Sequence, residues 1–480
     1  MNHPPRPVPT RLHGEGDCGR RRRCTISLLR GGQKHFAVLL SVLTSFMKIS
    51  LRFLCSFVLL ASAVAGEAGR PNIVLIISDD QGFTDYGFMG NSAVATPNID
   101  RMAAQSLLYT RGYVMPVCSP SLASLLTGKL PHQHGITGND LAKSTTPSPS
   151  DKKRDPLAHQ LLSNSLMLPK ALTDAGYSTF QSGKLWNVTY QDVGFTHGMT
   201  DTAGRHGDAG LAIGRKGMKP VFDFMDAAQA EKKPFFLWYA PMMPHEPHNA
   251  PAEILAHYLG KGLTPEAEKY YAMVEWFDQT CGELDGYLAK NNLTENTVIL
   301  YLADNGWDGI HGQKGHRAKL SPYEMGIRTP MFVRWPGKVT PKRDDETLAT
   351  ILDFPTTILK LAGVKAPAKL PGLDLLDRDA MTARKSIFIE SYTHDIADIA
   401  QPAKSLTTRV VIDGWSKLLI PGAARPDKVF ASAPTEVELF DLKTDPLEKT
   451  NLAAKQPEEV QRLQAIQQRA WDSAKDPERP

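Results

Sequence analysis

Cysteine is scarce in this chain, with five among 480 residues. Cys18, Cys24 and Cys55 lie in the first 65 residues, so only Cys118 and Cys281 would remain if that stretch were removed. Two cysteines cannot build the framework of several disulfides that stabilises small exported domains. The rest of the chain must therefore fold around an apolar core, for which 480 residues with 42% hydrophobic content are sufficient.

Most of the chain also lacks a positive charge excess. The formal net charge is +4, but the first 65 residues alone contain ten Lys and Arg against two Asp and Glu. The remainder is therefore net negative, by about four charges. Such a charge balance gives no reason to expect a nucleic-acid partner.

No apolar run near the N-terminus is long enough for a comfortable membrane span. The apolar stretch Phe53–Val64 follows the short basic region Met47–Arg52 and ends in the small residues Ala63–Ala65. This order is typical of a secretory signal peptide. We predict that residues 47–65 are a signal peptide and that residues 1–46 are an upstream over-extension. The protein would then be exported, to the periplasm or beyond, without spanning the membrane; a retained N-terminal anchor is the alternative.

Strand-like and helical patterns alternate from residue 70 to about residue 374. Short β-branched runs are followed by segments with helical spacing of apolar residues. This alternation predicts a large, mostly parallel sheet flanked by helices. The predicted strands are Ile73–Ser78, Ser178–Gln181, Phe235–Ala240, Thr297–Leu302 and Met331–Arg334, and the predicted helices are Pro97–Gln105, Cys118–Thr127, Leu168–Ala175, Pro220–Glu231, Glu266–Lys290 and Ile351–Leu361.

The pattern changes near residue 375. Short strands separated by turn residues and one final helix predict a small antiparallel sheet with a covering helix. We therefore expect a large α/β domain over residues 70–374 and a small C-terminal α+β subdomain over residues 375–480. The predicted elements of this subdomain are the strands Ser386–Ser391, Thr407–Asp413, Ser416–Ile420 and Val437–Leu442 and the helix Pro457–Ser473. The polar stretch Asp140–Arg154 is expected to be an exposed loop.

Two predicted strands end in oxygen ligands. Asp79 and Asp80 follow the first strand, and Asp304 and Asn305 follow the strand that begins at Thr297. Paired carboxylates there are costly unless a cation neutralises them, and open α/β sheets bind ligands at the carboxyl ends of their strands. Three carboxylates and an amide oxygen favour one Ca²⁺, with Mg²⁺ possible, over zinc. The alternative is a solvated turn in which Asp acts as a cap.

Cys118 stands at the predicted start of a helix. Pro120 suits the first turn, and Gly128 suits the helix end. The free N–H groups and the dipole at such a position favour an anion and can activate a thiol. The alternative is a buried, inert cysteine.

From Arg70 to about Leu452 the chain resembles the sulfatase family, in the alkaline-phosphatase-like superfamily. Each matching segment is short, but their order and spacing are specific. The segments are Pro71–Asp80, Thr96–Arg101, Cys118–Gly128, Ser182–Lys184, Pro244–Pro247, Asp304–Gly306, Tyr323–Pro330 and Glu438–Pro446.

The resemblance implies a metal centre and a modified nucleophile. Asp79, Asp80, Asp304 and Asn305 match the residues that bind Ca²⁺ in the family. Cys118 matches the cysteine that becomes formylglycine, whose hydrated form is both nucleophile and fifth metal ligand. A formylglycine-generating enzyme is then an expected partner during maturation.

The resemblance also implies roles for three other side chains. Lys184 and Lys319 match lysines that hold sulfate oxygens, and His245 matches the histidine that protonates the leaving alcohol. These roles suit the chemistry, since charge develops on the departing group and cations stabilise it. The expected function is that of an exported, Ca²⁺-dependent sulfuric ester hydrolase acting on a sulfated carbohydrate.

Two positions depart from the family pattern. Leu122 stands where the Cys-x-Pro-x-Arg motif has its arginine, and Asn187 stands where a histidine commonly follows the lysine of Gly183-Lys184. Leucine supplies no charge, and asparagine is no base near neutral pH. Two other functions therefore stay open: a non-catalytic binder of sulfated glycans, or a hydrolase of the superfamily that uses unmodified Cys118 or cleaves phosphate esters.

Overall fold

The computed structural model describes residues 69–142, 156–185, 188–201, 209–307, 317–425 and 432–473. All of them belong to one compact unit that spans residues 69–480. The predicted signal peptide and upstream extension lie outside the described residues, as do Asn187 and most of the predicted loop Asp140–Arg154. No helix within the described ranges is long and apolar enough to cross a membrane.

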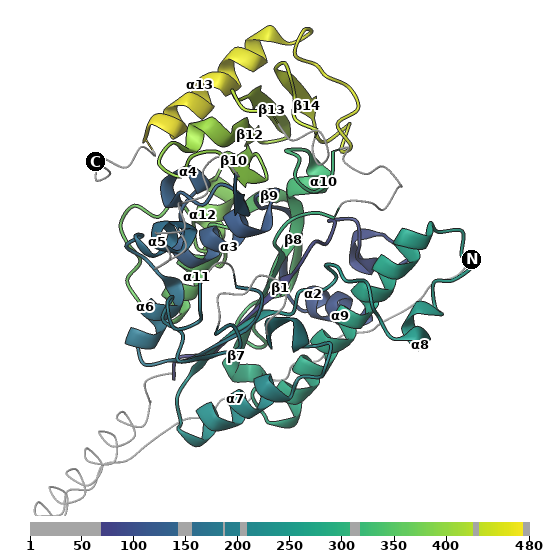
Figure 1. Ribbon diagram of the computed structural model, residues 1–480, viewed down its shortest axis with the longest axis vertical. Helices are drawn as coiled ribbons and strands as arrows, with labels where there is room; N and C mark the ends of the chain where they lie inside the picture. Colours follow the sequence, from purple (N-terminus) through teal and green to yellow (C-terminus); the bar gives the residue numbers. More distant parts are fainter. Residues whose placement is uncertain are drawn as a thin grey trace, which may run out of the picture. The chain divides into compact units, whose positions relative to one another are not determined.

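The main sheet has eight strands in the order β5-β4-β6-β1-β7-β8-β2-β9 (Figure 1). Among these strands, β8 alone runs antiparallel to its neighbours, so the predicted mostly parallel sheet is confirmed. The strands are β1 (Asn72–Ser78), β2 (Leu107–Tyr113), β4 (Ser178–Gly183), β5 (His197–Gly198), β6 (Phe235–Ala240), β7 (Thr297–Ala303), β8 (Arg328–Arg334) and β9 (Lys342–Thr350).

Strand β1 lies in the middle of this sheet and is buried along its whole length. Its side chains alternate between the two faces. One set packs under α3 (Cys118–Thr127), α5 (Pro156–Leu162), α6 (Leu168–Asp174) and α11 (Asp353–Leu361). The other set packs under α2 (Pro97–Ala104), α7 (Lys219–Ala230) and α9 (Pro265–Lys290). Figure 1 shows these two groups of helices on opposite sides of the sheet.

Three strands of the sheet were not predicted from the sequence, namely β2, the two-residue β5 and β9. Strand β2 contains Arg111, which is buried; its guanidinium donates to the backbone carbonyls of Glu346 and Gly414 and lies 3.7 Å from the ring centre of Trp415. Strand β9 begins with five charged residues and lies at the edge of the sheet. Charged residues are common on edge strands, where they oppose pairing with another chain.

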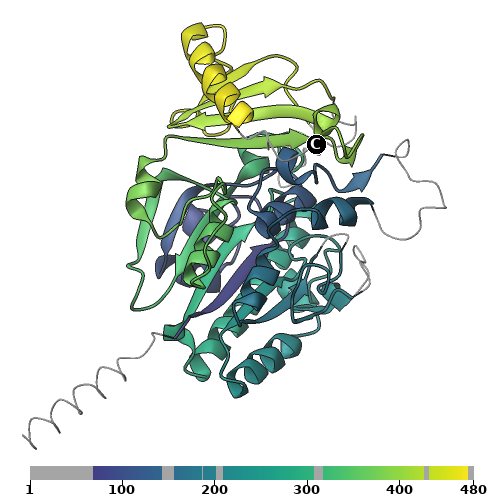
Figure 2. The same cartoon turned by 90° about the vertical axis from the view of Figure 1, so that its left-hand side faces the viewer.

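The C-terminal residues form the predicted second sheet, which is antiparallel, in the order β10-β12-β13-β14 (Figure 2). Helix α13 packs on it through an apolar cluster that includes Leu418 and Leu463. Its elements are β10 (Ser386–Tyr392), β12 (Leu406–Asp413), β13 (Ser416–Pro421), β14 (Glu438–Asp441) and α13 (Pro457–Ser473).

Short elements complete the described part of the chain. Strand β3 (Asp140–Leu141) pairs with β11 (Asp395–Ile396), so the predicted loop begins with a short strand. The others are α4 (Pro131–His134), α8 (Ala252–Leu255), α10 (Glu324–Ile327), α12 (Arg378–Ala383) and the 3-10 helices Gly87–Met89, Ala209–Ala212, Thr294–Asn296 and Pro402–Ser405.

Candidate active site and metal cradle

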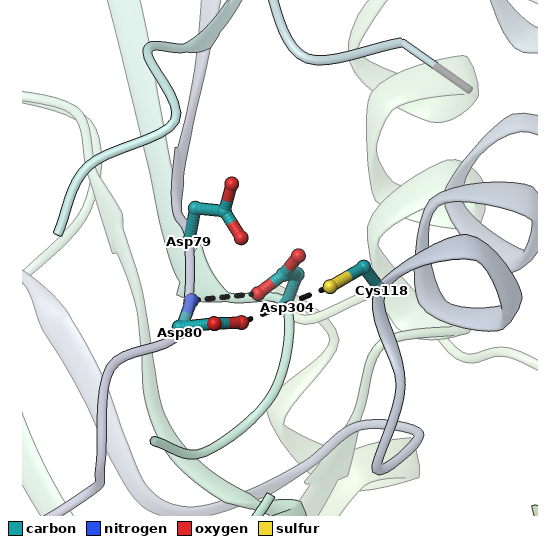
Figure 3. A group of neighbouring side chains, drawn as sticks. All are labelled: Asp79, Asp80, Cys118 and Asp304. Carbon is teal, nitrogen blue, oxygen red and sulfur yellow. Dashed lines mark hydrogen bonds between the residues drawn. The ribbon is translucent and has the colours of Figure 1, made fainter. Parts of the chain in front are cut away.

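Four side chains that could bind a metal converge at the carboxyl edge of the main sheet. The ligand atoms of Asp79, Asp80, Cys118 and Asp304 all lie within 4.8 Å of one another, and all four residues are buried (Figure 3). The sheet register explains this, because the parallel pairing of β1 with β7 ends at Ser78 opposite Ala303. The residues that follow these two strand ends are therefore neighbours in space. We call the set Asp79, Asp80, Asp304 and Asn305 the acidic cradle.

Backbone geometry holds the cradle in shape. Asp80 has φ 63°, a left-handed conformation that Asp tolerates better than most residues. Its N–H donates to Asp304 Oδ1 at 3.1 Å, and its carbonyl accepts from Tyr270 at 3.1 Å. The Ser121 hydroxyl, on α3, donates to the backbone carbonyl of Asp304 at 2.6 Å. Strand ends and helix start are thus connected directly.

The orientation of Asn305 suits a cation. Its Nδ2 donates to Asp80 Oδ1 and to the Gly306 carbonyl, both at 2.8 Å, so its Oδ1 is the acceptor that remains. Asn305 Oδ1 and Asp79 Oδ2 are buried, and neither has a hydrogen-bond partner among the described residues. Because unsatisfied buried oxygens are costly, these two atoms fit a hard cation with oxygen ligands.

Both predicted sulfate-binding lysines reach the cradle. Lys184 Nζ lies 2.6 Å from Asp79 Oδ1 and 3.4 Å from Asp304 Oδ2. Lys319 Nζ lies 2.6 and 2.5 Å from the two oxygens of Asp80. Lys184 is 2% exposed, so its charge has little access to water and acts mainly on the cradle.

Glycine is required just before Lys184. Gly183 ends β4 with φ 80°, and a Cβ atom there would lie 1.7 Å from the carbonyl oxygen of Ala240 on β6. That carbonyl accepts from the Lys184 N–H at 2.6 Å. The close approach of the two backbones turns the lysine out of the strand and towards the cradle.

Charge crowding in this buried place shifts several pKa values. Burial alone would raise the pKa of Asp80, but the charges of Lys319, His245 and Lys184 together lower it below its usual range. Burial and the charge of Asp79 raise the pKa of Asp304 to about 7. The pKa of Lys184 is raised, because the attraction of the carboxylates outweighs its burial.

His245 lies beside the cradle, and its side chain is more exposed, at 18%, than that of Asp80, at 8%. Its Nε2 is 3.6 Å from Asp80 Oδ2, and its Nδ1 is 2.8 Å from the backbone carbonyl of Glu246. Since a carbonyl can only accept, Nδ1 must carry a proton. Nε2 is therefore the ring atom that faces the cradle.

Cys118 occupies the first turn of α3, with its sulfur 3.7 Å from Asp80 Oδ1. Asn139 Oδ1 accepts from the next N–H of the helix, that of Ser119, at 3.1 Å. Burial raises the pKa of the Cys118 thiol, and the charges of Lys184 and Lys319 offset this only in part.

Leu122, at the motif position expected to hold arginine, packs into the apolar core. It is 1% exposed and lines a cavity of about 10 Å³ together with Ser119, Leu126, Ile136 and Leu157. The Ser119 hydroxyl in this lining has no hydrogen-bond partner among the described residues. The surroundings of Leu122 are thus mostly apolar.

The structure brings all eight predicted site residues together around one point: Asp79, Asp80, Cys118, Lys184, His245, Asp304, Asn305 and Lys319. Sequence reasoning missed the residues that hold them in place, namely Ser121, Asn139 and Tyr270. Their partners lie 183, 20 and 190 positions away. No local pattern in the sequence marks contacts of this kind.

The fold and the cradle define an alkaline-phosphatase-like α/β protein, and comparisons with known proteins identify its family. The family model described as Sulfatase matches residues 71–364, and that described as N-sulphoglucosamine sulphohydrolase, C-terminal, matches residues 312–475. The chain therefore belongs to the sulfatase family, whose members are sulfuric ester hydrolases.

Curated relatives agree with this assignment. The chain is 30% identical to N-acetylgalactosamine-6-sulfatase of Canis lupus familiaris over 66% of this chain and 68% of that protein. It is 28% identical to arylsulfatase A of Homo sapiens, over 86% of this chain and 90% of that protein. The chain thus spans about two thirds of the length of the first relative and most of the second.

Solved structures show the same fold. Ps i-CgsB superposes with a TM-score of 0.65 at 25% identity, over 84% of this chain and 93% of that one. The PsFucS1 sulfatase from Pseudoalteromonas sp. superposes with a TM-score of 0.64 at 22% identity, over 85% of this chain and 91% of that one.

Proposed function

We propose that this protein hydrolyses sulfate esters of a carbohydrate, with one Ca²⁺ in the acidic cradle and formylglycine formed from Cys118. The observation that carries the proposal is the convergence of two lysines and a histidine on a buried acidic cradle beside Cys118. Family membership supports the reaction class, and the unsatisfied oxygens of Asp79 and Asn305 support an oxygen-liganded cation.

The carbohydrate is proposed from the relatives. The relative with 30% identity is named for N-acetylgalactosamine 6-sulfate, and Ps i-CgsB has also been solved with k-i-k-neocarrahexaose. We extend only the class, a sulfated sugar, to this chain. Export to the periplasm or beyond belongs to the same proposal and depends on residues 47–65 acting as a signal peptide.

The reaction consumes water, breaks the S–O bond of the ester and yields an alcohol, a sulfate ion and a proton. When present, the cation and the hydrated aldehyde would supply a Lewis acid and a nucleophilic oxygen. Lys184 and Lys319 bring two positive charges to the place where the sulfate oxygens would lie. These charges stabilise the negative charge that grows on the departing group.

His245 is placed to protonate the leaving oxygen. Because Nδ1 is held by the Glu246 carbonyl, a proton can be donated only from Nε2. Nε2 lies 3.6 Å from Asp80 Oδ2, on the side of the ring that faces the cradle. Protonation matters most for a sugar alkoxide, which is a poor leaving group.

The direct test combines mass spectrometry with turnover. We expect the peptide that contains Cys118, isolated from the native host, to have the mass of the aldehyde. The purified protein should release sulfate from N-acetylgalactosamine 6-sulfate or 4-nitrophenyl sulfate in a Ca²⁺-dependent manner, and Cys118→Ala should lower kcat at least ~10³-fold because the nucleophile is lost.

Other outcomes would contradict the proposal in recognisable ways. A free thiol with turnover of 4-nitrophenyl phosphate would indicate a phosphoester hydrolase that uses unmodified Cys118. A free thiol with binding of sulfated glycan and no turnover would indicate a binder.

Leu122→Arg should raise the aldehyde fraction when a formylglycine-generating enzyme is co-expressed, because it restores the arginine of the family motif. It should also lower the Tm, since the ~10 Å³ cavity beside Leu122 cannot accept a guanidinium without strain or a buried charge. The aldehyde fraction is measured by peptide mass and the Tm by thermal unfolding.

Leu126→Arg is the matched control, because Leu126 lines the same cavity one helical turn later. It should lower the Tm in the same way without raising the aldehyde fraction. Equal aldehyde fractions in both variants would show that position 122 has no part in maturation.

A further inference from the structure

One arginine holds the loop that carries His245. Arg215 lies 30 positions before His245, and its guanidinium donates to that residue's backbone carbonyl at 3.1 Å. It also donates to the carbonyls of Pro241 at 3.2 Å and Met242 at 2.9 Å, and its Nε donates to Asn249 Oδ1 at 3.3 Å. One side chain therefore fixes both ends of the loop.

The opposite side of the loop rests on the cradle strand. The N–H of Asp79 donates to the Met243 carbonyl at 3.0 Å, and Asp79 and Pro244 form an isolated parallel bridge. Met242 has φ 53°, a left-handed conformation that a non-glycine residue adopts only when its surroundings impose it. The loop is thus held between a metal-ligand residue and the guanidinium.

A guanidinium suits this place better than an ammonium group does. The carbonyls of a loop that leaves a strand have no partner in the sheet, and the rigid fork of arginine can satisfy several acceptors at once. A lysine would keep the charge but could not hold three carbonyls in a fixed arrangement.

We infer that Arg215 is a positioning residue for the leaving-group step, fixing the His245 ring so that Nε2 faces the ester oxygen. This inference rests on the proposed function and deepens it. In that step the S–O bond breaks, its electron pair stays on the ester oxygen, and the proton from His245 Nε2 neutralises that oxygen. Arg215 touches neither the substrate nor the proton; it acts through the loop backbone.

The test compares two esters with different leaving groups. Arg215→Lys should lower kcat/KM for N-acetylgalactosamine 6-sulfate by ~30-fold, because displacing a proton donor costs most where the leaving group is poor. The loss for 4-nitrophenyl sulfate, whose phenolate leaves without help, should stay below ~3-fold. In a His245→Gln background, Arg215→Lys should have no further effect on the sugar ester, because the group it positions is gone.

Equal losses on both esters, or an additive loss in the His245→Gln background, would overturn the inference. Arg111→Lys is the matched control: Arg111 also donates to two backbone carbonyls, but at a distance from the site, on β2. It should lower the Tm without changing the ratio of the two kcat/KM values.

A second readout does not depend on turnover. In protein with ¹⁵N-labelled histidine, the Nδ1–H signal of His245, assigned with His245→Gln, should broaden or shift in Arg215→Lys. An unchanged signal would overturn the inference whether or not the parent hydrolyses either ester, so this readout is separate from the test of the proposed function. If Arg215→Lys does not fold, Arg215→Gln, which keeps one donor, is measured in the same two ways.

Discussion

Asp304→Asn is expected to abolish the Ca²⁺-induced rise in Tm and to lower kcat for sulfate-ester hydrolysis by at least ~10³-fold. Asp304 is fully buried beside Asp79 and Asp80, and its carboxylate is one of three in the cradle. A cation that binds only the folded state stabilises it by ~2.7 kcal/mol when the cation concentration is ~100 times its Kd. Loss of a side chain that binds the cation should therefore be visible as a lower Tm in the presence of Ca²⁺.

The same variant should not weaken the protein when a chelator is present. Without a cation the buried carboxylates repel one another, and removing one negative charge relieves that repulsion. The Tm of Asp304→Asn in chelator should therefore equal or exceed that of the parent. Asp174→Asn, at an exposed ion pair with Lys170, is the control and should keep the full Ca²⁺ response. A full Ca²⁺ response in Asp304→Asn would place the ion elsewhere.

Lys417→Met is expected to lower the free energy of unfolding by ~3–5 kcal/mol, the usual cost of leaving buried charges without their partner. Lys417 lies on β13 of the small sheet and is fully buried. Its Nζ lies 2.7 Å from Glu448 Oε1 and 3.1 Å from Glu324 Oε1, on α10 after the loop of Lys319. Without the lysine, two buried carboxylates would face each other.

The loss of unfolding free energy in Lys417→Met should increase with pH. Burial raises the pKa of Glu448 although Lys417 opposes this, and the neighbouring Glu324 raises it further. A carboxyl group whose folded pKa is raised favours the folded state at low pH, and this contribution is lost as the pH rises through the folded pKa. With Lys417 absent the pKa of Glu448 rises above the value of about 7 that it has in the parent, so the deficit relative to the parent should increase as the pH rises above about 7.

Urea unfolding at several pH values measures this deficit. Lys360→Met, which removes an exposed lysine paired with Asp374 at 2.8 Å, should cost less than ~1 kcal/mol. Adding Glu448→Gln to Lys417→Met should restore part of the stability. If Lys417→Met costs no more than Lys360→Met, the buried ion pairs of Lys417 with Glu324 and Glu448 contribute little to the free energy of unfolding.

The fold class could be predicted from the sequence because the central strands β1, β6 and β7 are strongly apolar, as strands buried on both faces must be. β6 and α13 have the bounds predicted from the pattern, and β1 and β7 differ from the prediction by one residue at an end. The order of the family motifs also predicted which side chains meet, since parallel strands end at a common edge of the sheet. The small antiparallel sheet followed from short strands separated by turn residues, and its observed pairing is antiparallel.

Strands whose pairing depends on distant partners were not predictable in this way. β2 carries Arg111 in its middle, and β9 begins with five charged residues, so neither shows an apolar alternation. Arg111 is tolerated in a buried strand because two carbonyls more than 200 positions away accept its protons. Burial of a charge depends on such partners, which no local pattern reveals.

By itself, the sequence determined the chemistry available to this protein: oxygen ligands after two apolar strands, a cysteine at a helix start, and two lysines and a histidine in the spacing of a sulfatase. Only the tertiary structure decided how these groups are held. It places Arg215 over the loop of His245, Asn139 at the start of α3, and Leu122 in the apolar core. The physical reason is that the side chains available to bind an ion or a sulfate group depend on residue type and on where strands end, and both can be read locally. The orientation of those side chains depends on hydrogen bonds and packing between residues far apart in the chain.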